Sequence, residues 1–154
     1  MGGKVVAKRL YDVSVALYTL HNLWDEIAED GAEIDKPNVL DEYYIGVYID
    51  DEYAGMARFY HLGQILIEGH IFLLDRSMSK ECGYEIMKWL ADNVDFNRLV
   101  CKIPECFQNV CGYVESLGFV EQGFSDDSFI KNNAICGIFE YGISKSDMVK
   151  LWAL

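Results

Sequence analysis

The chain has 154 residues and a formal charge of −12 at pH 7, and 51% of its residues are hydrophobic. This length and apolar fraction predict one folded domain, residues 1–154, and exclude a disordered chain. The negative charge disfavours non-specific binding to nucleic acid or anionic lipid, and no stretch has the ~18 consecutive apolar residues of a membrane helix. We therefore expect a cytoplasmic protein with no nucleic-acid or membrane partner.

The first half of the chain predicts one helix and four strands. Hydrophobic periodicity indicates, in order, a strand at 4–11, a helix at 12–30, a β-hairpin at 43–63 and a further strand at 64–75. The hairpin turns at "DDE", and Gly69 within the last strand suggests a bulge or a close backbone approach.

An acidic segment covers the end of the first helix and the loop before the hairpin. Eight carboxylates fall there with Lys36 as the one cation among them: Asp25, Glu26, Glu29, Asp30, Glu33, Asp35, Asp41 and Glu42. Such a run is typical of a solvated helix face and loop. The alternative is a surface that attracts a cationic substrate or a basic partner.

The second half predicts two helices alternating with strands. The pattern indicates a helix at 81–94, a strand at 98–104, a helix over 107–117, two strands around Asn132-Asn133, and a short tail. Three consecutive strands followed by strand-connecting helices predict a mixed sheet in the order β-α-β-β-β-α-β-α-β-β.

The cysteines give no metal-binding pattern. They are odd in number, form no CxxC pair, and have no histidine close to a cysteine pair. Zinc sites in proteins are built on such pairs. We therefore expect free thiols in a reducing compartment and no metal site.

The element order, together with "YVESLGF" (113–119) before the final hairpin, resembles the GNAT N-acetyltransferase superfamily. In that family the helix before the penultimate strand commonly ends in a Tyr-x-x-x-Gly-Phe pattern, and Gly118-Phe119 fits its end. The resemblance implies an α/β (α+β) fold whose mixed, mainly antiparallel sheet carries helices on both faces. It also implies acetyl-CoA as cofactor, bound where the fourth strand splays from the fifth. The pyrophosphate of this cofactor would accept hydrogen bonds from backbone amides at the start of the helix that follows the fourth strand.

The phosphate loop of that family, (Gln/Arg)-x-x-Gly-x-(Gly/Ala), falls on Met78 to Gly83, where the last position matches. Glu81 takes the place of the middle glycine and brings a negative charge toward the phosphates. We leave open an unusual acyl-CoA site, a site for another anion, or a strand-to-helix turn with Ser79 as N-cap. For the first, the resemblance implies these cofactor-binding residues: Leu73, Leu74, Met78, Ser79, Lys80, Cys82, Gly83, Tyr84 and Asn109.

The resemblance also implies catalytic candidates. Glu68 and His70 are two apart on the fourth strand, so they share a face, and either could remove the proton of the amine. The alternative is a hydrogen-bonded pair at the core edge. The family's acid tyrosine falls on Val114, and the neighbouring candidate, Tyr113, lies about 100° around the helix.

Three functional hypotheses follow. The first is an N-acetyltransferase that acts on a cationic small molecule or a protein amine. The second is a non-catalytic protein. The spacing of His70, the degenerate junction at Met78 to Gly83 and the "NNAICGIFEYGIS" end also look like divergent GNAT-like proteins of tailed bacteriophages. Such a protein would act in virion (head) assembly or as a protein-interaction module, in the host cytoplasm or virion, through a protein partner. The acidic segment and an exposed apolar tail (Leu151, Trp152, Leu154) would then be contact surfaces. The alternative for the tail is that it docks onto the sheet of its own chain. The third, from acidity alone, is a DNA-mimicking inhibitor.

Overall fold

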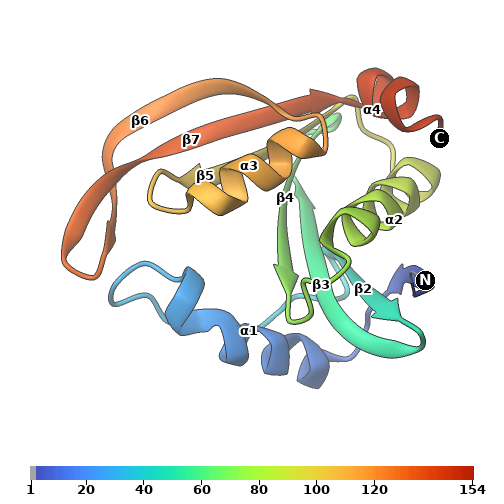
Figure 1. Ribbon diagram of the computed structural model, residues 1–154, viewed down its shortest axis with the longest axis horizontal. Helices are drawn as coiled ribbons and strands as arrows, with labels where there is room; N and C mark the ends of the chain where they lie inside the picture. Colours follow the sequence, from blue (N-terminus) through green and yellow to red (C-terminus); the bar gives the residue numbers. More distant parts are fainter. Residues whose placement is uncertain (1–2) are drawn as a thin grey trace.

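The computed structural model describes residues 3–154, which form a seven-stranded sheet and four helices (Figure 1). The predicted order of elements is confirmed, and the tail adds a fourth helix. The bounds are β1 Val5–Arg9, α1 Val13–Ile27, β2 Tyr43–Ile49, β3 Glu52–His61, β4 Leu66–Leu73, α2 Ser79–Asn93, β5 Arg98–Pro104, α3 Gln108–Ser116, β6 Val120–Lys131, β7 Ala134–Ser144 and α4 Lys145–Trp152.

The sheet has the strand order β1-β2-β3-β4-β5-β7-β6, and its pairs are antiparallel except for β4 with β5. The mixed, mainly antiparallel sheet is therefore confirmed. Both predicted hairpin turns form where short polar residues accept positive φ: Asp50 and Asp51 between β2 and β3, and Asn132 and Asn133 between β6 and β7.

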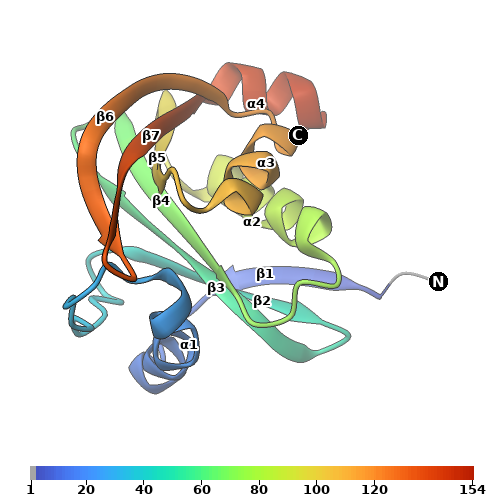
Figure 2. The same ribbon diagram turned by 60° about the vertical axis from the view of Figure 1, so that its left-hand side comes forward.

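Helices cover both faces of the sheet, as predicted (Figure 2). Along β2, Tyr44 packs in a cluster with residues of α1, whereas the next residue, Ile45, packs in the main core with α2 and α3. This division follows from the alternation of side chains along a strand. Within residues 3–154, no helix is both long and apolar enough to cross a membrane.

The C-terminal tail packs onto the protein, which confirms the alternative of a docked tail and not the exposed apolar surface of the second hypothesis. The hydroxyl of Ser144 caps α4 by accepting a hydrogen bond from the Asp147 amide. Met148 is fully buried, and the indole Nε1 of Trp152 donates to the carbonyl oxygen of Leu117 at 3.1 Å. Leu151 remains 59% exposed, which leaves a single apolar side chain rather than a patch.

Candidate functional site

A cleft opens where β4 and β5 diverge. The two strands pair in parallel over Leu66–Glu68, and beyond Glu68 β4 pairs with β3 while β5 pairs with β7. The space between them, about 530 Å³, is lined by residues of α1, β4, α2, β5, α3, β6 and β7. Gly69 lies in this wall, and a Cβ there would overlap the ring of Phe59. The glycine is therefore explained by the packing of this side chain, and the predicted bulge or close backbone approach does not occur.

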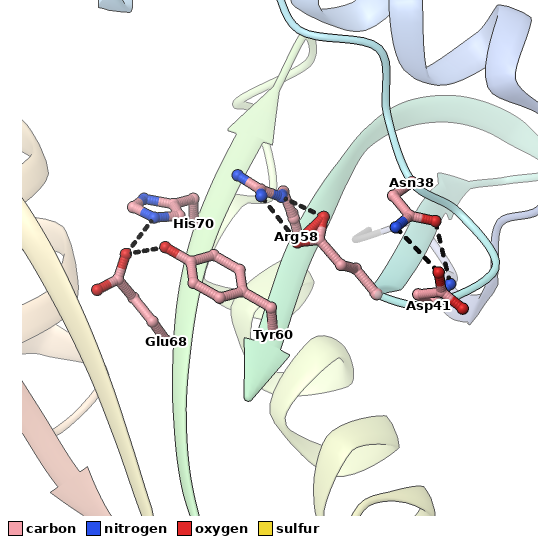
Figure 3. A network of polar contacts seen from close by, with 7 residues as sticks. Asn38, Asp41, Arg58, Tyr60, Glu68 and His70 are labelled. Atoms are coloured by element: carbon pink, nitrogen blue, oxygen red, sulfur yellow. Dashed lines mark hydrogen bonds and ion pairs between the residues drawn. The ribbon is translucent and has the colours of Figure 1, made fainter. Parts of the chain in front are cut away.

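A polar group of side chains lies at the base of the cleft. Figure 3 shows Tyr60, Glu68 and His70 converging from β3 and β4. The Oε2 atom of Glu68 accepts a hydrogen bond from the Tyr60 hydroxyl and lies 3.0 Å from Nε2 of His70. The ammonium of Lys102 is 3.9 Å from the other carboxylate oxygen. Glu68 is buried, whereas His70 is partly exposed and borders the cleft.

The surroundings of Glu68 keep it ionised. The hydrogen bond from His70 lowers its pKa to about 2, and the hydrogen bond from Tyr60 and the charge of Lys102 act in the same direction against the opposing effect of burial. A carboxylate of such low pKa is a weak base at neutral pH. Glu68 therefore suits the role of orienting His70 better than that of a proton acceptor.

The ionised state of Glu68 also fixes the tautomer of neutral His70. A carboxylate accepts hydrogen bonds only, so Nε2 of His70 must carry the proton that it shares with Glu68. The other ring nitrogen, Nδ1, is then a bare acceptor, and it has no hydrogen-bond partner in the described part of the chain. The prediction from the sequence that Glu68 and His70 share a face of the strand is confirmed. At the cleft, the imidazole of His70 is able to accept a proton.

The start of α2 lies close to the cleft and has no side-chain cap. Met78 is the N-cap residue and makes no side-chain cap bond, and Ser79 is the first helical residue, so the prediction of Ser79 as N-cap is wrong. Without a cap among the described residues, the amides of the first turn remain available to an anion. Glu81 lies in that turn, where its charge interacts favourably with the helix dipole.

The predicted cofactor-binding residues separate into three groups. The side chains that line the cleft are Leu73, Ser79 and Asn109. Another set borders a separate groove of about 370 Å³ together with Glu81 and Trp152: Met78, Lys80 and Tyr84. The remaining residues have structural contacts: Cys82 and Gly83 are buried within α2, and the amide of Leu74 donates to the carbonyl oxygen of Ala54.

Tyr113 borders the cleft, but its hydroxyl is already engaged. It donates a 2.6 Å hydrogen bond to the carbonyl oxygen of Ser79. Burial raises the pKa of Tyr113, and the nearby charges of Cys82 and Glu81 raise it further. A raised pKa weakens a phenol as an acid, so Tyr113 as the acid stays a prediction without support from this geometry.

The hairpin of β6 and β7 forms a curved arch (Figures 1 and 2), and Phe129 and Ile138 of this arch line the cleft. The tip of the arch is attached to the end of α1: the carboxylate of Asp30 accepts from the amides of Asn132 and Asn133 at 3.0 and 2.9 Å. Glu29 accepts from the amide of Ile130 at 2.9 Å, and the Lys131 ammonium donates to two backbone carbonyls at the end of α1.

The acidic segment is largely solvated, as expected, because six of its eight carboxylate residues are exposed, but some of its carboxylates also bind other parts of the protein. Besides Glu29 and Asp30, Glu42 forms a two-point ion pair with Arg58, and Glu26 pairs with Arg76 at 2.7 Å. Half of the eight carboxylates therefore hold parts of the protein together. In the part of the chain that the structure describes, no group of three or more potential ligands could hold a metal ion.

The family described as "Protein of unknown function (DUF2824)" matches residues 12–154. The chain belongs to the DUF2824 family. A comparison with curated proteins gives no match.

Solved GNAT acetyltransferases have the same fold as this DUF2824 chain. The Vibrio cholerae spermidine N-acetyltransferase, in complex with CoA and spermine, is 11% identical with a TM-score of 0.76, over 94% of this chain and 98% of that one. A GNAT-family acetyltransferase from Streptococcus pneumoniae is 10% identical (TM-score 0.73; 92% and 99%). Salmonella typhimurium yncA, with its cofactor acetyl-CoA, is 13% identical (TM-score 0.72; 92% and 94%). These likenesses show the GNAT fold.

Sequence reasoning missed two members of the polar group in the DUF2824 chain, Tyr60 and Lys102. Tyr60 lies directly opposite Glu68 in the β3–β4 register, and Lys102 lies two residues beyond the partner of Glu68 on β5. The strand predictions contained both residues, but only the register of pairing brings them together. Arg58, which stacks on the Tyr60 ring at 4.6 Å, was missed for the same reason (Figure 3).

Proposed function

We propose that this protein transfers an acetyl group from acetyl-CoA to a primary amine, with His70 as the general base. The observation that carries the proposal is the Glu68–His70 pair, in which an ionised, buried carboxylate holds an imidazole whose Nδ1 is a free proton acceptor beside the cleft. The GNAT fold, shared with acetyltransferases solved with acetyl-CoA or CoA, supports this reaction class.

The cleft fits the cofactor in two respects. Beyond Glu68, the edge of β4 that faces β5 has no strand partner in the described chain, so its backbone groups are free to pair with an amide-bearing arm. The uncapped start of α2, which borders the cleft at Ser79, suits a pyrophosphate. Glu81 is exposed and borders the separate groove, which keeps its carboxylate out of the cleft.

Each residue has a distinct role in this proposal. Bound acetyl-CoA supplies the acetyl group as a thioester. Nδ1 of His70 accepts a proton from the amine nitrogen as that nitrogen bonds to the acetyl carbon. Glu68 holds the ring through Nε2 and stabilises the imidazolium that forms. Tyr113 stays the candidate for protonating the departing thiolate, although its hydroxyl is bound to Ser79.

The lining of the cleft favours an amine on an apolar or aromatic body. Its walls are mostly aliphatic and aromatic, and Phe129 of the arch is part of them. Its polar side chains include Arg76, Lys102 and His70, whereas Glu26 is already paired with Arg76. A polycation such as the spermine bound by the Vibrio cholerae enzyme would find little unpaired negative charge in this cleft.

The test combines binding and turnover. Isothermal titration with acetyl-CoA should give saturable heat. An acetylation assay read by mass spectrometry should give a higher kcat/KM for phenethylamine than for spermidine. His70→Gln should lower kcat by roughly 10²-fold or more with the affinity for acetyl-CoA unchanged. The matched control is His61→Gln, because His61 is exposed at the end of β3 and does not border the cleft.

Two results would count against the proposal. The absence of heat and of thermal protection at millimolar acetyl-CoA would remove the enzymatic function and favour the non-catalytic, assembly-protein alternative. Unchanged turnover in His70→Gln, with binding intact, would instead retain the acetyltransferase and exclude His70 as its base.

A further inference from the structure

Two cysteines outside the proposed catalytic group, Cys106 and Cys136, are close to the tip of the arch or to the strand that pairs with it. Cys106 is in the turn that joins β5 to α3 and is exposed, and Cys136 is in β7 and partly exposed. Both are free thiols in this structure. The proposed acetyl transfer uses neither of them.

The strand register, continued into the turn after β5, brings Cys106 and Cys136 next to each other. β5 and β7 form an antiparallel pair, and one residue beyond the ladder the amide of Glu105 still donates to the carbonyl oxygen of Gly137 at 2.8 Å. The next pair of positions is Cys106 and Cys136. Facing residues at such a non-hydrogen-bonded position have Cα atoms about 4.5 Å apart, which lies within the range of about 4.4–6.8 Å that a disulfide spans.

Neighbouring side chains bring the segment that contains Cys106 to the face of the arch that carries Cys136. Cys136 pairs with Phe129 in the β6–β7 register, so the two share a face of the arch. The ring of Phe129 meets the edge of Phe107, the residue after Cys106, with centroids 5.8 Å apart. Partial burial, and next the neighbouring Cys136 side chain, raise the pKa of Cys106.

We propose that Cys106 and Cys136 are a reversible redox site that closes to a disulfide when the chain meets a low-molecular-weight disulfide such as oxidised glutathione. The Cys106 thiolate attacks one glutathione sulfur and releases one glutathione thiol, which leaves a mixed disulfide. The Cys136 thiolate then attacks the Cys106 sulfur and releases the second thiol. The protein loses two protons and two electrons, and the oxidant is reduced to two thiols.

The bond would join the arch to the wall of the cleft. Cys106 precedes α3, which carries Val110 and Tyr113 of that wall, and Cys136 belongs to the arch, which also lines the cleft. Oxidation would therefore restrict movement of the arch relative to α3. This redox site stands whether or not the protein transfers acetyl groups.

The test uses the full chain, reduced and then equilibrated at pH 8 with oxidised and reduced glutathione in a series of ratios. Free thiols are trapped with N-ethylmaleimide, and intact mass and peptide mapping locate the bonds. We expect a peptide pair linked through Cys106 and Cys136, two fewer maleimide additions, and a Tm higher by roughly 5 °C, all reversed by dithiothreitol. Cys136→Ser should stop at the glutathione adduct, whereas the control Cys111→Ala should still form the cross-link.

Other products would overturn the proposal. Separate glutathione adducts on the two cysteines at every ratio would show that the thiols do not reach each other. A disulfide that joins two chains through Cys106, or one from Cys106 to Cys111, would assign the reactive pair elsewhere.

Discussion

The hydroxyl of Tyr113 on α3 donates a 2.6 Å hydrogen bond to the carbonyl oxygen of Ser79, the first residue of α2. This contact occupies the space that Gly83 leaves open: a Cβ at Gly83 would lie 2.6 Å from the Tyr113 hydroxyl and 2.9 Å from the Leu117 side chain. The glycine that resembles part of a phosphate loop is therefore explained by the packing of two helices.

Gly83→Ala should destabilise the protein by about 1–3 kcal/mol because the added methyl overpacks the contact between α2 and α3. The matched control is Gly112→Ala on α3, where a Cβ meets nothing within 4 Å and the higher helix propensity of alanine should stabilise by up to ~1 kcal/mol. Urea unfolding of both variants measures the difference. Equal effects at the two positions would contradict this account of Gly83.

Glu68 should contribute to stability against acid. Because the pKa of Glu68 is lowered from 4.5 to about 2 by His70 and its other partners, its ionised form stabilises the fold above pH 4.5. That stabilisation, on the order of 2 kcal/mol, is lost as the pH falls from 4.5 toward 2. Glu68→Gln should flatten the pH dependence of unfolding in this window, whereas Glu52→Gln, at an exposed site, should leave it as in the wild type.

Asp30 should hold the tip of the arch on α1. Its hydrogen bonds from the amides of Asn133 and Asn132 lower the pKa of its carboxyl group, so these bonds persist to lower pH than an ordinary aspartate would allow. Asp30→Ala should make amide exchange at Asn132 and Asn133 several-fold faster. The control on the same arch, Asp126→Ala, should not, and unchanged protection in Asp30→Ala would show that other contacts hold the tip.

Removing Met148 should cost core energy, because α4 is packed and not a docking tail. Met148→Ala should lower the free energy of unfolding by about 2–5 kcal/mol, since the side chain is fully buried. Leu151→Ala, at an exposed position of the same helix, should cost less than about 1 kcal/mol. Thermal unfolding of the two variants gives the comparison, and a small loss for Met148→Ala would restore the view of a detachable tail.

The strands and helices were predictable because their signals are local. Alternation and helical periodicity depend on neighbours in sequence, and the turn residues Asn132 and Asn133 tolerate positive φ wherever they occur. The same local reasoning failed at the start of α2. There Ser79 was a candidate N-cap because a serine hydroxyl commonly caps a helix. In the structure Ser79 is the first helical residue, and Met78 is the N-cap residue.

By itself the sequence determined the order of elements, the mixed sheet and the shared face of Glu68 and His70, since each follows from the repeat of side-chain directions along a strand or helix. The tertiary structure decided which carboxylates are paired, which residues line the cleft, and that Cys106 lies next to Cys136. Such relationships join residues that are far apart in the chain. The distances between these residues depend on the register of strand pairing and on helix packing, and local periodicity carries no information about either.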